Sequence, residues 1–177
     1  MNVLKTQRLT LRPFCDNDAE AMFKGWTYDE RVARYCRWYP HKSIETTKQL
    51  LKMYLDEAAG GFTYRWAIEI AETQELCGCI DVVDISDDGK TASVGYVLSF
   101  DKWNRGYMTE ALEAVIEKLF CEGFEAVSAV HYIDNIASGR VMEKCGMKYV
   151  GNDKTLYKYG SDELCDVKVY EIRKADN

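Results

Sequence analysis

The apolar residues change their spacing near residue 100, and this change limits the folds that the 177-residue chain can adopt. Before that point, three short strand-like runs follow one another with only turn signals between them. After it, apolar residues recur every three or four positions, as they do on one face of a helix. Short connections favour an antiparallel meander for the first part, and alternating helices and strands favour a mixed α/β arrangement for the second.

The individual segments can be placed on the sequence. Strands are expected at residues 7–14, 64–70, 76–85, 91–100, 126–132, 148–157 and 164–173. Helices are expected after the capping residues Asp16 and Asn17, from Ser43 to Gly60-Gly61, from Met108 to Gly123, and at 136–145. No repeat or linker interrupts them. We therefore expect one domain over residues 1–177, with about seven strands in one mixed, mostly antiparallel sheet and helices on both faces.

Composition narrows the classes of function. The formal charge is −6, which argues against broad nucleic-acid binding, because such binding needs many Lys and Arg side chains at phosphates. No apolar run approaches the roughly 18 residues of a membrane span. The first residues, MNVLKTQRLTLRPF, lack a signal-peptide block and have the pattern of a strand. We expect a cytoplasmic protein with no membrane contact.

Seven cysteines and two histidines bear on redox and metal chemistry. Cys77 and Cys79 are the one close pair, and their spacing is not that of a zinc finger. The sequence therefore predicts buried, reduced thiols and no bound metal. Cys121 and Cys145 fall on predicted helices with no histidine near them in sequence, which disfavours a covalent thiol intermediate.

The segment from Gly95 to Val115 has a pattern typical of phosphate binding. A strand leads through the loop 103–108 directly into a helix. The first amides of a helix lack internal partners and favour negative charge. Gly106 lets a ligand approach the main chain, and Lys102 and Arg105 add positive charge. A diphosphate fits such a site, although most Gly-to-helix junctions bind nothing and the loop lacks both the dinucleotide and the nucleoside-triphosphate patterns.

Five motifs in order resemble those of the GNAT superfamily of acetyl-CoA-dependent N-acetyltransferases, most closely its branch of ribosomal-protein-alanine acetyltransferases. They span nearly the whole chain and lie at Thr6–Pro13, Gly95–Leu98, Arg105–Ala111, Asn135–Ser138 with Glu143–Met147, and Asp166–Val167 with Tyr170. The resemblance implies a GNAT-like sheet that splays between the family's fourth and fifth strands. The acyl thioester would lie in that gap.

The same resemblance implies which residues hold acetyl-CoA. The main chain of Val97, Leu98 and Ser99 would pair with the pantetheine arm, as an added strand does. An N–H near Val97 or Leu98 would stabilise the oxyanion by about 3 kcal/mol. Asn135 would bind the pantetheine amides. The diphosphate would lie on the N–H groups of Arg105, Gly106, Tyr107, Met108 and Thr109.

Two positions depart from the family's loop. Trp103 stands where the family has a polar residue, so a polar contact is expected to be lost. Met108 crowds the last position without removing its N–H. Because the phosphate donors are main-chain groups, the expected site survives both changes.

Proton transfer is less evident from the sequence. The family's usual Glu and Tyr positions match Ser93 and Met142, so neither role carries over. In the ribosomal-protein branch a serine donates a proton to the thiolate, and Ser138 matches it; the alternative is that Ser138 stabilises the helix start. Tyr157 matches the branch's carboxylate position.

A phenol is a poor base near pH 7, because its reference pKa is about 10. We therefore expect deprotonation through a water that Tyr157, Glu69 or Asp81 orders. The alternatives are a packed aromatic for Tyr157 and a solvent-facing side chain for Glu69.

The free-energy cost of deprotonating an amine favours a particular class of acceptor. Exposing the neutral form of an α-amine at pH 7 costs about 1 kcal/mol, whereas a lysine side chain costs about 4.6 kcal/mol. The expected acceptor is a protein N-terminal α-amine, an amino acid or a small amine. The cluster from Arg34 to Tyr39 either forms the acceptor wall or is a half-buried helix connection.

The leading hypothesis is an N-acetyltransferase that uses acetyl-CoA as cosubstrate and direct attack by the amine. The second hypothesis is a non-catalytic module that binds and senses acyl-CoA, which the missing Glu and Tyr would permit. The third is an RNA- or ribosome-associated protein, whose binding would collapse with salt. The oligomeric state stays open on sequence alone, a homodimer included.

Overall fold

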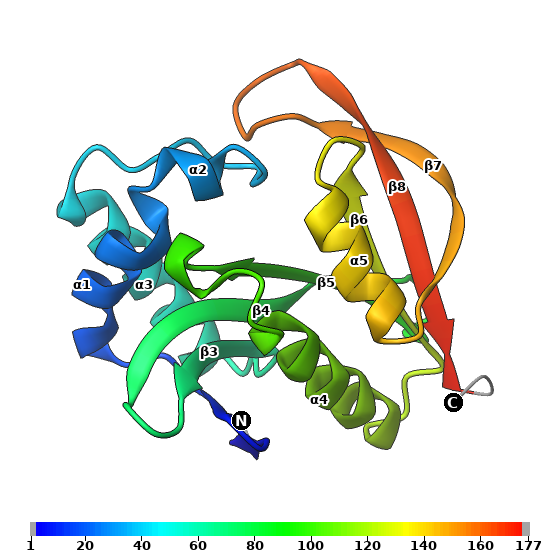
Figure 1. Cartoon of the computed structure of the whole chain (residues 1–177), viewed down its shortest axis with the longest axis horizontal. Helices are drawn as coiled ribbons and strands as arrows, with labels where there is room; N and C mark the ends of the chain where they lie inside the picture. Colours follow the sequence, from blue (N-terminus) through cyan, green and yellow to red (C-terminus); the bar gives the residue numbers. More distant parts are fainter. Residues whose placement is uncertain (1–2, 175–177) are drawn as a thin grey trace. The chain divides into compact units, whose positions relative to one another are not determined.

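The computed structural model describes residues 3–174 of the chain (Figure 1). Its strands are β1 (Leu4–Lys5), β2 (Leu9–Arg12), β3 (Arg65–Ile70), β4 (Glu75–Ile85), β5 (Thr91–Leu98), β6 (Ala126–Tyr132), β7 (Lys148–Leu156) and β8 (Leu164–Arg173). Its α-helices are α1 (Ala19–Met22), α2 (Glu30–Ala33), α3 (Ile44–Ala59), α4 (Tyr107–Cys121) and α5 (Ile136–Lys144). The bounds of β6 and β8 coincide with those expected from the sequence.

The strands pair in the order β1-β2-β3-β4-β5-β6-β8-β7. The sheet is mixed and mostly antiparallel, as expected, and within the described residues β5 and β6 make the one parallel pair. That pairing covers only Thr91–Val94 and Ala126–Ala129, which is consistent with the expected splay. The family's fourth and fifth strands correspond to β5 and β6 because β1 is additional. Sequence reasoning missed β1, since two residues are too few to show a period.

Two compact units make up the chain. The first comprises the residues up to Asp81 together with Tyr96–Tyr107, and the second comprises Val82–Gly95 together with the residues from Met108 on. Strands β4 and β5 run through both units.

In the first unit, helices α1 and α3 pack on one face of β3 and β4 (Figure 1). Their shared core buries residues from each of these elements, among them Met22, Leu51, Ala67 and Cys79. The long helix α3 has the apolar spacing that the sequence indicated, and it ends at Gly60. Residue Gly61 then has φ +103°, a conformation that suits glycine.

The start of α1 differs from the expectation. Neither Asp16 nor Asn17 makes the capping bond; instead Asp18 Oδ2 accepts the N–H of Cys15 at 2.8 Å. Asp18 is fixed there because Arg12 donates to both of its oxygens at 2.9 Å. The α-helix is also shorter than expected, because a π-helical turn at Phe23–Thr27 follows Met22.

In the second unit, α5 lies against β6 and β8 (Figure 1). The apolar face expected for α4 is buried at every position named from the sequence: Met108, Ala111, Leu112, Val115, Leu119 and Phe120. Gly146, with φ +79°, follows the last turn of α5 as the sequence indicated. Apolar spacing therefore sufficed to place α4, and Gly146 marked the end of α5.

The cysteines are free thiols. Cys77, Cys79 and Cys145 are buried as expected, but Cys15 and Cys121 are exposed, so the prediction of buried thiols is wrong for these two. Across residues 3–174, no three His, Cys, Asp or Glu side chains gather in a way that could hold a metal ion. None of the helices in that range has the length and apolar character needed to cross a membrane.

Candidate functional site

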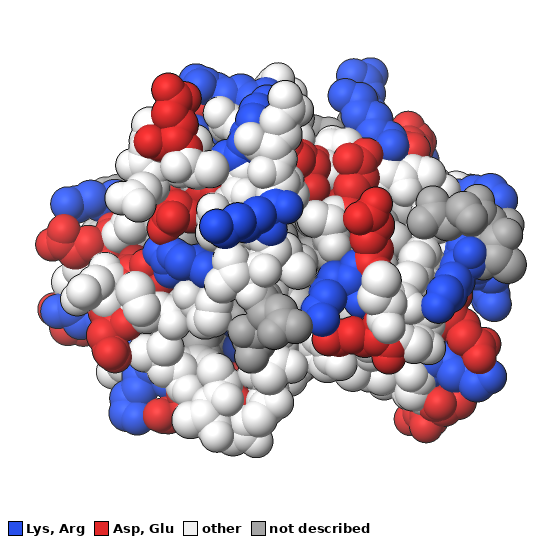
Figure 2. Space-filling model, turned by 90° about the horizontal axis from the view of Figure 1, so that it is seen from below, with Lys and Arg blue, Asp and Glu red and all other residues white. Residues whose placement is uncertain are grey.

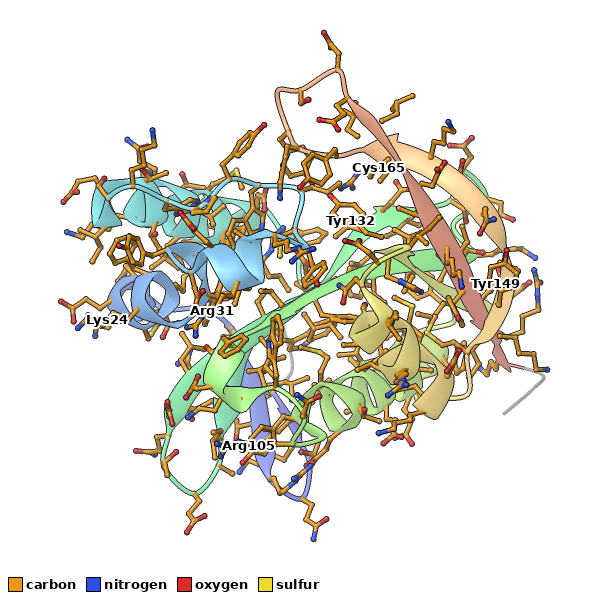
Figure 3. All side chains as sticks on the ribbon, turned by 45° about the horizontal axis from the view of Figure 1, so that its top comes forward. Lys24, Arg31, Arg105, Tyr132, Tyr149 and Cys165 are labelled. Carbon is orange, nitrogen blue, oxygen red and sulfur yellow. The ribbon has the colours of Figure 1, made fainter. Side chains whose placement is uncertain are left out.

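The loop before α4 combines an exposed turn with a helix start, the two features that the sequence predicted for it. Asn104 and Gly106 take positive φ values of 59° and 78°, and α4 begins at the next residue, Tyr107. Figure 3 shows Arg105 at the loop that leads into this helix. Arg105 and Gly106 are exposed, Tyr107 and Thr109 are half-buried, and Met108 is buried. The side chain of Met108 thus packs inward, while its amide belongs to the first turn, whose N–H groups lack helical partners.

Arg8 braces this loop, and sequence reasoning missed it. Its Nη1 donates to the carbonyl oxygen of Arg105 at 3.0 Å, and its guanidinium carbon lies 4.7 Å from the centre of the Tyr107 ring. A Cβ on Gly106 would lie 3.4 Å from Arg8 Nη2. Arg8 therefore adds a second guanidinium beside Arg105. The hydrogen-bonded pair is 97 positions apart in the sequence, so no local pattern could reveal it.

The end of β5 is fixed by two internal hydrogen bonds. Ser99 N–H donates to the carbonyl oxygen of Cys77 on β4 at 2.8 Å. The indole Nε1–H of Trp103 donates to the carbonyl oxygen of Leu98 at 2.8 Å. Trp103 thus supplies a polar contact of its own, whereas the sequence suggested only the loss of one. These bonds hold the segment that was expected to meet the thioester.

Gly78 on β4 lets β5 come close. A Cβ at this position would overlap the carbonyl oxygen of Val97 and would lie 3.2 Å from the Cα of Leu98. The carbonyl of Val97 therefore faces β4. This carbonyl and the N–H of Leu98 belong to the same trans peptide, in which C=O and N–H point in opposite directions, so the N–H of Leu98 faces away from β4.

In the second unit, Asn135 caps α5. Its Oδ1 accepts the N–H of Ser138 at 3.3 Å, so the cap uses the oxygen and leaves the amide NH₂ to donate elsewhere. Both side chains are half-buried. Asn135 thus stabilises the helix start. The sequence had suggested this role for Ser138, as the alternative to proton donation.

Tyr157 lies just beyond the end of β7, in the same unit as Ser138. Tyr132, at the end of β6 (Figure 3), donates from its hydroxyl to the carbonyl oxygen of Tyr157 at 2.5 Å. The two rings lie 5.7 Å apart. The main chain of Tyr157 is thereby held, and its side chain is half-buried.

Cys145 also belongs to this unit and offers little reactivity. Its thiol donates to the carbonyl oxygen of Thr109 at 3.5 Å. Burial raises the pKa of Cys145 to about 12. Since the thiolate is the nucleophilic form, Cys145 is a poor carrier for an acyl group near neutral pH.

The cluster from Arg34 to Tyr39 divides between two environments. Cys36 and Trp38 pack against the core of the first unit, whereas Tyr39 is 60% exposed. Tyr39 lines a hollow of about 860 Å³ whose other walls are Lys24, Tyr28, Asp29, Glu30, Arg31, Pro40, His41 and Lys42. The cluster is therefore partly a helix connection and partly the wall of an open depression.

Charge is distributed without a large area of one sign on the face in Figure 2, where acidic and basic side chains alternate. The positive groups beside the loop at Gly106 are thus a local feature, in keeping with the formal charge of −6.

Comparison with known proteins identifies the fold and the family. The family described as "Acetyltransferase (GNAT) domain" matches residues 8–148. The chain is 32% identical over 173 residues to "Uncharacterized N-acetyltransferase YoaA" of Bacillus subtilis (strain 168), with 97% of each chain covered.

Solved structures of acetyltransferases have the same fold as this chain. A GNAT-family acetyltransferase from Bacillus anthracis superposes with a TM-score of 0.85 at 25% identity, over 98% of this chain and 99% of that one. The ribosomal L7/L12 alpha-N-protein acetyltransferase RimL, solved in complex with coenzyme A, superposes with a TM-score of 0.83 at 19% identity. That alignment covers 99% of this chain and all of RimL (100%), and it shows a shared fold.

Proposed function

The chain belongs to the GNAT acetyltransferase family and is an acyl-CoA-dependent N-acetyltransferase, and we propose that it transfers the acetyl group of acetyl-CoA to an α-amine or a small primary amine. The whole chain, residues 1–177, would act as one catalytic domain. The observation that supports the proposal is the exposed turn at Arg105–Gly106 directly before α4. The first amides of a helix lack helical partners, so this turn would offer them to an anion.

Acetyl-CoA would be bound mainly by main-chain groups. The amides of Arg105, Gly106, Tyr107, Met108 and Thr109 would hold the diphosphate, and Arg8 would add charge beside them. The pantetheine arm would run along Val97, Leu98 and Ser99. Asn135 would donate its amide NH₂ to that arm, because its oxygen is engaged by the helix cap.

We assign the N–H of Leu98 as the hydrogen-bond donor to the thioester oxygen. The carbonyl of Val97 faces β4, so Val97 N–H points to the same edge and Leu98 N–H points away from it. The bonds of Ser99 to Cys77 and of Trp103 to Leu98 fix this amide before the substrate arrives. A donor fixed in advance stabilises developing negative charge without reorganisation, by about 3 kcal/mol.

The chemistry proceeds by direct attack. The neutral amine forms a bond to the thioester carbon, and the carbonyl electrons move onto the oxygen at Leu98 N–H. When the tetrahedral adduct collapses, the carbon–sulfur bond breaks and the thiolate of CoA leaves. The hydroxyl of Ser138 would give that thiolate a proton and recover one from the nitrogen, directly or through water, and Tyr157 would order such a water.

The acceptor class follows from proton free energies. An α-amine needs about 1 kcal/mol to become neutral at pH 7, and a lysine side chain needs about 4.6 kcal/mol. RimL is named as an alpha-N-protein acetyltransferase. An α-amine is the acceptor class with the lower free-energy cost of deprotonation. The half-exposed cluster from Arg34 to Tyr39 would contact the acceptor.

An acceptor panel tests this function. Release of free CoA from acetyl-CoA would be followed with N-terminal peptides, amino acids, small amines, and peptides whose α-amine is blocked but whose lysine is free. We expect turnover with α-amines and at least tenfold less with the blocked lysine peptides. Binding of acetyl-CoA without turnover of any acceptor would contradict the proposal and favour a sensor of acyl-CoA.

Ser138 has its own test. Ser138→Ala should lower kcat about 100-fold with little change in the KM for acetyl-CoA, if the hydroxyl is a general acid. Ser138→Thr keeps a hydroxyl and serves as the matched control. Equal rates for Ser138→Ala and the unaltered protein would reduce Ser138 to a structural residue.

A further inference from the structure

Asp81, on β4, carries a carboxylate that is held at one oxygen and open at the other. Arg65 Nε donates to Asp81 Oδ2 at 2.9 Å. Within residues 3–174, Oδ1 accepts no hydrogen bond, and it is not among the buried polar atoms that lack a partner. The side chain is 16% exposed. Asp81 can therefore accept one further hydrogen bond from a molecule that reaches it.

Arg65, the partner of Asp81, is held in its orientation by contacts of its own. The guanidinium of Arg65 is paired with Glu57 on α3, and it stacks over the ring of Tyr54, 3.9 Å from the ring centre. Phe62 contacts the same guanidinium at 5.2 Å. Such an arrangement keeps the Asp81 carboxylate in place without closing its free oxygen.

The ionisable groups around Asp81 act in opposite directions. Burial is the largest influence and raises the pKa of Asp81 above the ordinary carboxyl value, Arg65 opposes the rise, and Glu57 adds to it. Tyr54 and Cys79 face the same cluster, but burial raises both of their pKa values, so they stay neutral near pH 7. Asp81 is thus a stronger base than an exposed aspartate.

Asp81 also lies on the relevant side of the first unit. It follows Cys79 by two residues and so shares its face of β4. Cys79 belongs to the core against which Val97, Cys36 and Trp38 pack. The carboxylate therefore shares a face with Val97 of the segment assigned to the thioester and with Cys36 and Trp38 of the cluster assigned to the acceptor.

Glu69 is a weaker candidate than Asp81 for contact with the amine, by its position in the sheet and by its hydrogen bonds. It lies on β3, one strand farther from β5 than Asp81 does. Its Oε2 accepts from Arg12 Nε at 2.8 Å, in the network that also fixes Asp18 at the start of α1. That network holds the N-terminal part of the unit together, so Glu69 has a structural task.

We propose that Asp81 is the general base of the reaction, and this assignment rests on the proposed function. The acceptor enters as an ammonium, and one water relays its proton to Oδ1 of Asp81. The nitrogen keeps its electron pair, attacks the thioester carbon and expels the thiolate, while Asp81 returns its proton to solvent. The balance is one ammonium and one acetyl-CoA giving one amide, one CoA thiol and one proton.

Asp81→Asn tests the proposal, because it preserves the shape and can still accept the bond from Arg65. With the best acceptor of the panel, kcat/KM at pH 7 should fall about 100-fold or more. The loss should shrink as the pH rises, because the variant depends on amine that is already neutral in solution. Its kcat/KM should climb about tenfold per pH unit up to the acceptor's own pKa, whereas the unaltered enzyme should level off at lower pH.

Two further variants separate the outcomes. Asp56→Asn removes an exposed carboxylate of α3 that pairs with Lys52, and it should leave rate and pH profile unchanged. Asp81→Glu keeps a carboxylate, so it should retain the profile of the unaltered enzyme at a lower rate. Acetyl-CoA affinity and the melting temperature report whether each variant folds.

The proposal is overturned if Asp81→Asn keeps its rate and profile, if Glu69→Gln produces the altered profile instead, or if a folded Asp81→Glu behaves like Asp81→Asn. If the unaltered protein acetylates no amine at all, the proposed function fails first, and this result is distinct from an active enzyme that ignores Asp81.

Discussion

The loop before α4 and the carboxylate cluster around Arg65 serve the proposed reaction by different means. The loop uses main-chain amides, which any sequence offers once the turn and the helix start are in place. The cluster uses side chains from α3, β3 and β4 that only the folded chain brings together. A site made of backbone is therefore tolerant of side-chain changes and sensitive to backbone geometry, and a site made of side chains is the reverse.

The largest effect on CoA binding should come from the backbone of the loop. Gly106→Pro forces φ to about −65°, whereas the native value is +78°. At least two charge-assisted hydrogen bonds to the diphosphate would be lost, each worth about 1.5 kcal/mol or more, so the affinity for CoA should fall about 100-fold. Calorimetry measures the affinity, and circular dichroism should show unchanged helix content.

Asn104→Gly is the matched control for that loop, because Asn104 also has positive φ and glycine adopts it without strain. Its CoA affinity should equal that of the unaltered protein. If Gly106→Pro binds CoA as well as Asn104→Gly, the diphosphate lies elsewhere.

A smaller effect is expected at Gly78. An alanine there must displace the carbonyl of Val97, which moves the amide of Leu98. A shift of about 1 Å at reacting atoms can cost up to about 100-fold, so Gly78→Ala should lower kcat at least tenfold with CoA affinity less affected. Gly60→Ala, in ordinary helical geometry with φ −74°, is the control. Normal kcat for Gly78→Ala would remove Leu98 from the oxyanion role.

Sequence reasoning succeeded where the signal is local. Apolar spacing located β6, β8 and the buried face of α4, and the turn at Gly106 was visible because glycine and a helix start adjoin in sequence. It failed for Arg8, Trp103 and Arg65, whose partners are set by strand pairing or by loop closure. Two carboxylates, Glu69 and Asp81, could be named as candidates, but only their partners in the fold distinguish them.

Arg8 combines features of both kinds of site, because its side chain holds a main-chain carbonyl of the loop. The Arg8 side chain is exposed, so its hydrogen bond to the carbonyl of Arg105 adds only about 0.5–1 kcal/mol. Arg8→Ala should raise the KM for acetyl-CoA about threefold and leave kcat unchanged. Lys5→Ala removes a nearby exposed cation of β1 and is the control; equal KM values for the two variants would refute the bracing role.

The smallest effect concerns stability alone. Asp29 caps α2 by accepting the N–H of Arg31 at 2.9 Å, and the hydrogen bonds from Arg31 lower the pKa of Asp29. Asp29→Ala should cost about 1 kcal/mol of unfolding free energy at pH 7, with unchanged acetyl-CoA binding.

The pH dependence of that cost has a definite sign. Because the folded pKa is depressed, the contribution of the carboxylate is present above about pH 4 and is lost as the pH falls through the folded value. Urea unfolding of both proteins at pH 7 and near pH 3 measures this. A difference between the two proteins that grows on acidification would contradict the assignment.

The central claim is that main-chain amides grip acetyl-CoA, and amide chemical shifts test it directly. We expect titration of ¹⁵N-labelled protein with acetyl-CoA to move the amide signals of Leu98 and of residues 105–109 most, together with the side-chain NH₂ of Asn135. The diphosphate-free fragment S-acetylpantetheine, which keeps the thioester, should move the signals of Leu98 and Asn135 but leave those of residues 105–109 unmoved. Saturating CoA that leaves residues 105–109 unchanged would contradict the account.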